Sequence, residues 1–289
     1  MFGENLASRS TPSTAPGHVR RPSPQGVLAP DSQGNAGPPQ VSLTPTGGGL
    51  GAARPWGCSD QTDPYALGLH FKTTKAYEQA AIWLRKAAEL GSAQAQYHLG
   101  SLYKNGQGVQ QDPAEAAFWY GKAAVQGHAR AQGNLGVLYK CGLGVPQDFD
   151  EAAVWLRKAA EQGYAAAQYH LGTLYREGLG RQQDDAIAGT WFALAAEQGN
   201  VPAQYHLGLL YRDGQGVRQD FAQAAAWMRK AAEQGCSYAQ YGLGMLYQNG
   251  HGVPKDDDQA ATWLRKALDQ GQGDCDAHGD YPRQAIARQ

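Results

Sequence analysis

Six tryptophans that recur at one fixed step constrain this chain more than any other feature of its sequence. They are Trp83, Trp119, Trp155, Trp191, Trp227 and Trp263, each 36 residues after the one before. A glycine series keeps the same step, at Gly91, Gly127, Gly163, Gly199, Gly235 and Gly271. Such equal spacing is the signature of a repeat array, in which each unit buries its apolar face by stacking on its neighbours.

One unit contains two helical patterns separated by a Gly-rich loop. Within residues 92–127, Leu99 and Leu102 follow helical spacing in the first half, and Trp119 and Ala123 do so in the second half. The unit therefore reads as a first helix, a loop, a second helix and a terminal glycine.

Residues typical of helix ends stand at fixed places in each unit. Gly106 and its equivalents suit the left-handed residue that ends a helix. Asp112 and its equivalents suit the N-cap of the second helix, where a carboxylate accepts from orphan backbone N–H groups. A Glu or Gln three residues later, as at Glu115, predicts a reciprocal capping box. One unit has Ile187 at that place instead.

These residues together resemble a known family. The pattern A-x-A-Q-x-x-L-G-x-x-Y-x-x-G-x-G-V-x-x-D-x-x-x-A-x-x-W-x-x-K-A-A-x-x-G is similar to the Sel-one-like repeat (SLR), a relative of the tetratricopeptide repeat, over about 210 of the 289 residues. The resemblance implies an all-α fold, a right-handed α/α superhelical solenoid of helix-turn-helix repeats that usually serves protein–protein interaction. It does not imply an enzyme.

We divide the repeat region, residues 58–271, into a shortened repeat and five full repeats. The shortened repeat R1 spans 63–91, and the full repeats are R2 (92–127), R3 (128–163), R4 (164–199), R5 (200–235) and R6 (236–271). We expect the tryptophans to fill the space between neighbouring helix pairs. The Arg-Lys pairs that follow them, such as Arg157-Lys158, are typical of a solvated helix face.

The segments outside the repeats have a different composition. Residues 1–57 are rich in Pro, Gly, Ser and Thr, so they cannot bury enough apolar surface to offset their ordering entropy, and we predict a disordered tail. This tail is a solubilising segment or, since it loosely resembles the Ser/Pro-rich N-termini of injected bacterial effectors, an export signal. We predict a C-terminal tail or cap over 272–289.

Charge and hydropathy exclude several classes of partner. The net charge of −1 predicts no strong attraction to nucleic acid or to an anionic membrane. No apolar run approaches the roughly 20 residues that span a bilayer, and the start of the chain lacks the features of a secretory signal. The four cysteines do not follow the repeat, which favours a reduced compartment or a fold that does not depend on disulfides, with one disulfide from chance proximity as the alternative. We therefore predict a cytoplasmic protein, with export without a cleavable signal peptide as the alternative.

Aromatic, imidazole and basic residues recur at three positions of the first helices. These positions lie between the apolar anchors, and the family resemblance places the first helices on the concave surface, so we expect them to line a groove. The basic residues among them would attract an acidic peptide. The alternative is structural: the tyrosines pack between helices, the histidines are tolerated polar residues, and the cations are favoured near a helix C-terminus. We call this set the first-helix stripe: Tyr97, His98, Lys104, Asn134, Lys140, Tyr169, His170, Arg176, Tyr205, His206 and Arg212.

Nothing in the sequence supplies catalytic or metal chemistry. No nucleophile–base–acid set recurs, and the Gly-x-Gly loops lack the strand and Gly-Lys-Ser/Thr of a phosphate loop. Histidines in repeats about 10 Å apart cannot share a zinc ion with bonds of about 2 Å, and Cys275 with His278 is one lone pair. We expect no metal, no cofactor and no catalysis, although some family members have been credited with hydrolase activity. The main hypothesis is a scaffold or adaptor for a protein or peptide.

Overall fold

The computed structural model describes residues 63–269, and these residues form twelve α-helices and no strand. The tails predicted over 1–57 and 272–289 lie outside the described residues. Each repeat contributes a first helix and a second helix. The helices are α1 (Pro64–Thr73), α2 (Tyr77–Glu89), α3 (Ala93–Asn105), α4 (Pro113–Val125), α5 (Ala129–Cys141), α6 (Phe149–Glu161), α7 (Ala165–Glu177), α8 (Asp185–Glu197), α9 (Val201–Asp213), α10 (Phe221–Glu233), α11 (Ser237–Asn249) and α12 (Asp257–Asp269).

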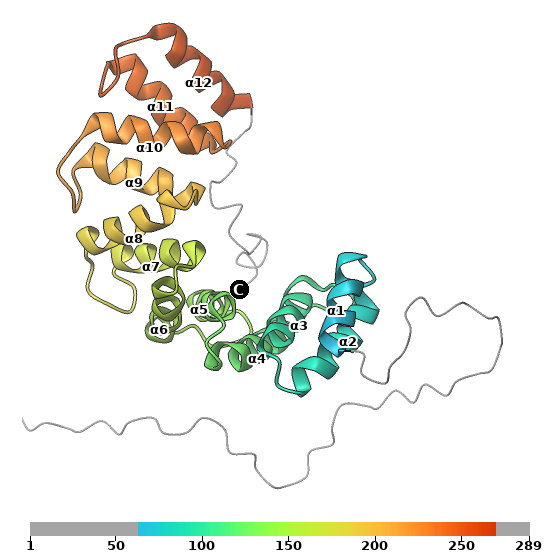
Figure 1. Ribbon diagram of the computed structural model, residues 1–289. Coiled ribbons are helices and arrows are strands. Elements are labelled where there is room, and N and C mark those ends of the chain that lie inside the picture. The colour runs from blue at the N-terminus through green and yellow to red at the C-terminus, as the bar shows by residue number, and fades with distance from the viewer. Residues whose placement is uncertain (1–62, 270–289) are drawn as a thin grey trace, which may run out of the picture. The chain divides into compact units, whose positions relative to one another are not determined.

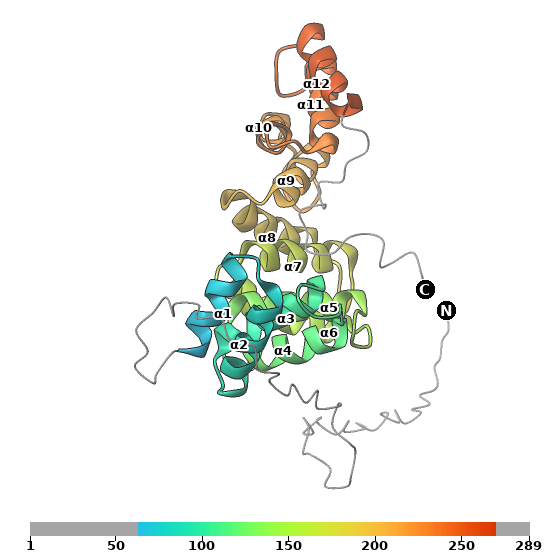
Figure 2. The ribbon, with the colours of Figure 1, turned by 90° about the vertical axis from the view of Figure 1, so that its right-hand side faces the viewer.

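Each helix packs on the helix before it and on the helix after it in the chain. The order is visible in two perpendicular views, in which the helices follow one another from α1 to α12 (Figures 1 and 2). The predicted all-α solenoid of helix pairs is therefore confirmed.

The ends of the helices follow their sequence signals with one exception. Gly106 ends α3 with φ of 65°, and Asp112 caps α4 by accepting from the backbone N–H groups of Ala114 and Glu115 at 2.9 and 3.1 Å. The capping box is wrong, because the N–H of Asp112 already donates to the Tyr103 carbonyl at 3.0 Å. The Glu115 carboxylate instead accepts from the indole N–H of Trp119 at 3.1 Å.

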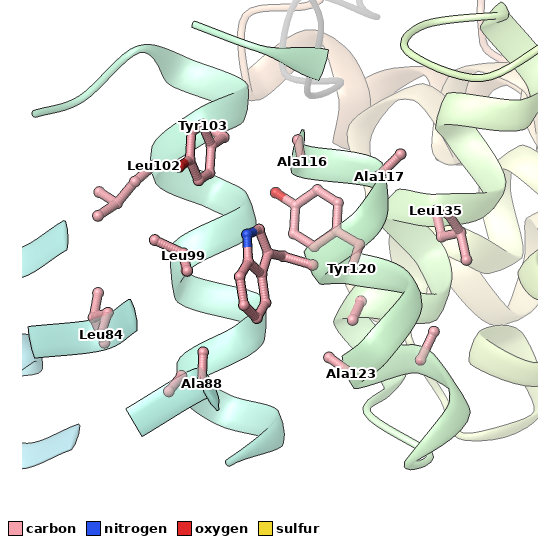
Figure 3. Close-up of a cluster of buried hydrophobic side chains, with 14 of the residues drawn as sticks. Leu84, Ala88, Leu99, Leu102, Tyr103, Ala116, Ala117, Tyr120, Ala123 and Leu135 are labelled. Carbon is pink, nitrogen blue, oxygen red and sulfur yellow. The ribbon is translucent and has the colours of Figure 1, made fainter. Parts of the chain in front are cut away.

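The centre of each helix pair is occupied by the residue that follows the tryptophan. Leu84, Tyr120, Leu156, Phe192 and Met228 are all 0% exposed. Each lies over a glycine of the first helix, so a Cβ placed at that glycine would come within 3.0 Å of its side chain. Figure 3 shows this arrangement in R2, with Tyr120 between Leu84 of R1 and Leu135 of R3.

The tryptophans pack against the core from its edge, so they fill less of the space between neighbouring helix pairs than we expected. Trp119 is buried, at 6% exposed, but the other five described rings are partly exposed. A lysine three residues on lies over most of them, with Nζ 4.2 Å from the Trp155 ring in the case of Lys158. The cation and the ring attract each other, and the lysine stem shields apolar surface.

The arginines of the Arg-Lys pairs do not form a merely solvated face. Arg157 donates to the Tyr175 hydroxyl in the next repeat at 2.5 Å, and Arg229 does the same to Tyr247 at 2.8 Å. Arg85 donates to Tyr103 in the same way. These bonds link R1 to R2, R3 to R4 and R5 to R6.

Buried glutamines form a second set of links between repeats. Gln96 Nε2 donates to the Ala88 carbonyl of the preceding repeat at 3.0 Å, and Gln126 Nε2 donates to Gln96 Oε1 at 2.7 Å. Bonds from buried amides to backbone carbonyls satisfy groups that would otherwise be costly to bury. We call this recurring set the glutamine ladder: Gln96 with Gln126, Gln132 with Gln162, Gln168 with Gln198, and Gln204 with Gln234.

The second glycine of each loop seats one repeat on the previous one. Gly216 has φ of +67°, and a Cβ added there would lie 2.2 Å from the Asp185 backbone. The loop therefore approaches the start of the preceding second helix more closely than any side chain allows. The loops expected to be only helix terminators are also interface elements.

Candidate functional site

The first-helix stripe lies on α3, α5, α7 and α9, between successive first helices. Asn134 and Tyr169 are buried, and the other members are partly exposed. The stripe is thus neither a row of free side chains nor a closed core. Several of its members bond to or stack on side chains of the next repeat, and most keep some surface in water.

The basic members reach forward to the next repeat. Arg176 Nη1 donates to Nδ1 of His206 at 2.6 Å, and Lys140 Nζ donates to the Thr173 hydroxyl at 3.0 Å. In R1, Lys72 Nζ donates to Nδ1 of His98 at 2.9 Å. These bonds fix cations that would otherwise be flexible.

Lys72 belongs with the stripe, although it was not among the residues predicted for it. It stands five residues after Leu67, as Lys104 stands five residues after Leu99. The signal was therefore present in the alignment of R1 with R2. The connection after α1, residues 74–76, is shorter than the Gly-rich loops of the full repeats, and this difference obscured the equivalence.

The tyrosines pack against rings from the next repeat. Tyr97 stacks on His128 with ring centroids 4.7 Å apart, and Tyr169 stacks on His206 at 5.7 Å. R3 has Gly133 at this position, and the Tyr164 ring of R4 covers it, 2.7 Å from where a Cβ would stand. The gap in the tyrosine series is thus filled by a tyrosine from the following repeat.

Two histidines of the stripe are held neutral. Burial, with the charge of Lys72 as the next cause, lowers the pKa of His98 to about 4. Burial and the charge of Lys140 lower the pKa of His170 to about 3. A neutral His98 can accept the Lys72 hydrogen bond through Nδ1, whereas a protonated one would place two cations in contact.

The stripe changes between R5 and R6, where a cavity of about 520 Å³ opens. Gly242 of R6 stands at the position that His206 holds in R5. Arg212 therefore meets no histidine and instead forms an ion pair with Asp213, with Nε and Oδ1 2.7 Å apart. The cavity is lined on its stripe side by Tyr205, Arg212, Tyr238, Tyr241 and Gly242.

Residues 63–269 contain neither a candidate metal site nor a candidate membrane span. In this part of the chain, no three His, Cys, Asp or Glu side chains are grouped so that they could hold a metal ion. No helix within the same residues has the length and apolar character needed to cross a bilayer.

The chain matches the family model described as the Sel1 repeat six times, at 65–92, 93–128, 129–164, 165–200, 201–236 and 237–272. It is 42% identical to a protective antigen of uropathogenic Escherichia coli that displays an SLR fold, with a TM-score of 0.68. That match covers 72% of this chain but only 45% of the antigen. A Sel1 repeat protein from Oxalobacter formigenes is 37% identical, with a TM-score of 0.69, over 73% of this chain and 84% of its own length. No curated protein matches the sequence.

Proposed function

Because the chain belongs to the Sel1 repeat family, we propose that it is a non-catalytic scaffold that binds another protein or a peptide along its first-helix stripe. The charged members of the stripe are all cations, so the occupant carries acidic residues. The role is that of an adaptor, and neither nucleic acid nor a membrane takes part.

The observation that carries this proposal is the order imposed on partly exposed side chains. Arg176 is held by His206, and Lys140 by Thr173, so their rotamers are set before a partner arrives. Ordering a long side chain during binding costs about 0.5–1.5 kcal/mol, and this cost is already met in the free protein. Partly exposed Tyr97 and Tyr205 add the aromatic surface that contact sites favour.

The test compares two triple variants of equal charge change. In the first, Lys140, Arg176 and Arg212 are replaced by Glu. In the control, the exposed cations Arg218, Lys255 and Arg265, which lie outside the stripe, are replaced by Glu.

Partners captured by the immobilised full chain are identified, purified and titrated against both variants by calorimetry. We expect the stripe variant to weaken binding at least tenfold and the control variant to bind as the wild type does. Far-UV circular dichroism checks that both are folded. A folded stripe variant with unchanged affinity would remove the stripe from the binding site.

A second proposal concerns where the scaffold acts. The similarity to a protective antigen and the composition of residues 1–57 favour an exported protein that works as an effector outside the cell. Residues 1–57 fused to a reporter should then be translocated by a secretion machine. If cells with that machine intact retain the reporter, the export proposal is rejected and the proposal of a cytoplasmic adaptor is kept.

A further inference from the structure

The position that His206 holds in R5 is Gly242 in R6, and the structure shows a cavity beside that glycine. At the interface of R4 and R5, the His206 ring lies between other side chains. Its centroid is 5.7 Å from that of Tyr169 and 5.3 Å from that of Phe192, and both rings are stacked on it. Arg176 Nη1 holds its Nδ1 atom at 2.6 Å. This interface therefore contains a complete binding pocket for an aromatic ring, occupied by the chain itself.

Part of this arrangement recurs between R5 and R6. Tyr205, Arg212 and Gly242 line the cavity there, Met228 does not line it, and Tyr238 of R6 stacks on Tyr205 with ring centroids 6.1 Å apart. Counting 36 residues onward, Tyr205 replaces Tyr169, Met228 replaces Phe192, Arg212 replaces Arg176, and Gly242 replaces His206. The cavity of about 520 Å³ lies here. A Cβ added at Gly242 would meet only the flexible end of Met228, with Sδ at 3.0 Å and Cε at 3.5 Å. Gly242 itself lines the cavity, so a larger side chain at 242 has the cavity beside it.

The donor that holds the ring in R5 has a counterpart here. Arg212 bonds Asp213 through Nε at 2.7 Å and through Nη2 at 2.8 Å. Its Nη1 atom, which corresponds to the one that Arg176 uses for His206, takes no part in this ion pair. The cavity thus offers a charged donor as well as apolar walls.

The aromatic walls of the cavity are unusually open to water. Tyr205 is partly exposed, whereas its counterpart Tyr169 at the preceding interface is 7% exposed. Tyr241 and Tyr238, which also line the cavity, are 57% and 37% exposed. A ligand that covers apolar ring surface now left in water would be stabilised by removing that surface from water. Pockets of this size with apolar walls and a few polar groups are typical ligand sites.

We propose that the R5–R6 cavity is an anchor pocket for an aromatic side chain of the bound polypeptide, a tyrosine or histidine whose ring carries a hydrogen-bond acceptor for Arg212. This inference rests on the proposed scaffold function and names one contact within it. The ring of the partner takes the place that His206 takes in the preceding repeat, so the partner supplies what R6 lacks.

The probes are three capped pentapeptides, Ac-Ala-Gly-Xaa-Gly-Ala-NH2, in which Xaa is Tyr, His or Leu. Each is titrated into the ¹⁵N-labelled full chain at pH 7, and the amide shifts of residues 241 and 242 are followed. We expect saturable binding of the Tyr and His peptides and at least tenfold weaker binding of the Leu peptide. Equal binding of all three would overturn the proposal, because a general apolar surface would explain it.

Two variants test the position of the site. Gly242→His should fill the pocket from within and weaken the Tyr and His peptides at least tenfold. Gly121→His is the matched control, since an added Cβ there meets nothing within 4 Å, and it should change nothing. Unchanged peptide binding by a folded Gly242→His chain would overturn the proposal.

A gain of binding provides the converse test. His206→Gly should empty the R4–R5 pocket and raise the stoichiometry from one peptide to two, with shifts that appear at residues 205 and 206. Binding that remains at one peptide per chain would contradict the equivalence of the two pockets. If the peptides bind only after residues 270–289 are deleted, the occupant is the chain's own C-terminal segment, and the partner proposal is overturned.

The scaffold function and the pocket can fail separately. Gly242→His leaves every member of the first-helix stripe in place. Capture that depends on Lys140 and Arg176 but not on residue 242 would keep the scaffold and remove the pocket. Peptide binding at residue 242 without any captured protein would keep the pocket and remove the scaffold.

Discussion

Replacing two adjacent residues, Trp191 and Phe192, separates the landmark of the repeat from the residue that fills its core. Trp191 is partly exposed, and Phe192 is 0% exposed. We predict that Phe192→Ala destabilises the protein more than Trp191→Ala does, although tryptophan is the larger side chain and the more regular one in the sequence.

The magnitudes follow from the surroundings of each ring. Phe192 lies over Gly172, where a Cβ would come within 2.7 Å of a ring carbon, so the facing helix offers no side chain at this point to fill the space. Its loss should cost about 4–5 kcal/mol, the upper part of the range for Phe→Ala in a core. Trp191 packs from the edge, and Leu194 replaces the lysine found beside other tryptophans. Its loss should cost about 1–2.5 kcal/mol for apolar area returned to water.

Urea unfolding followed by far-UV circular dichroism measures both variants, because fluorescence would be altered by the loss of an indole. Amide exchange in α7 and α8 reports whether the loss is local, since a linear array can open in segments. Phe192→Leu is the control and should cost less than about 1.5 kcal/mol, because Leu84 and Leu156 occupy this position in other repeats. Equal or greater loss in Trp191→Ala would refute the assignment of the core.

Two further predictions concern acid and glycine. A histidine in the unfolded chain has a pKa of about 6.5, whereas the folded-state pKa values of His98 and His170 are about 4 and about 3. As the pH drops below about 6.5, the unfolded state therefore binds protons before the folded state does, and the free energy of unfolding falls. The free energy of unfolding should fall by about 1–3 kcal/mol between pH 7 and pH 5 after allowance for solvent screening. Replacing both histidines by Asn, the residue that R3 carries there, should reduce the dependence of the urea midpoint on pH. An unchanged dependence on pH would contradict this. Gly216→Ala should lower the free energy of unfolding by at least about 2 kcal/mol, because φ is positive and the Asp185 backbone is 2.2 Å from the added Cβ. The control Gly121→Ala, in an open helical position, should be neutral or stabilising by up to about 1 kcal/mol. Similar melting temperatures for the two variants would refute the close contact between loop and preceding helix.

The fold could be predicted from the sequence because the repeat states the same pattern several times. The residue that fills the core escaped this reasoning because its identity changes from repeat to repeat, as Leu156, Phe192 and Met228 show. The side chain there is always large and fully buried in R1 to R5, although its shape varies, and only the packing reveals what the position does. The invariant tryptophan drew attention away from it.

The interfaces were harder to predict than the helices. Arg157 and Lys158 look like an exposed pair on one helix, but the Arg157 partner is a tyrosine 18 residues further on, in the next repeat. Helical periodicity describes a single helix and contains no information about its neighbour. For the same reason, the sequence shows Gly242 at the position of His206, whereas the cavity beside Gly242 depends on the packing of R5 against R6.

The glutamine ladder has a consequence for how such chains change length. Its bonds recur at fixed offsets, 8 for Gln132 with the Ala124 carbonyl of the preceding repeat and 30 for Gln162 with Gln132 of the same repeat. Removing or inserting 36 residues at any cut point brings equivalent partners together again, so the new junction inherits a full set of buried amide bonds. An insertion or deletion that is not a whole number of units would leave buried glutamine amides without hydrogen-bond partners. Unequal recombination between repeats should therefore leave viable shorter and longer proteins, in steps of one whole unit.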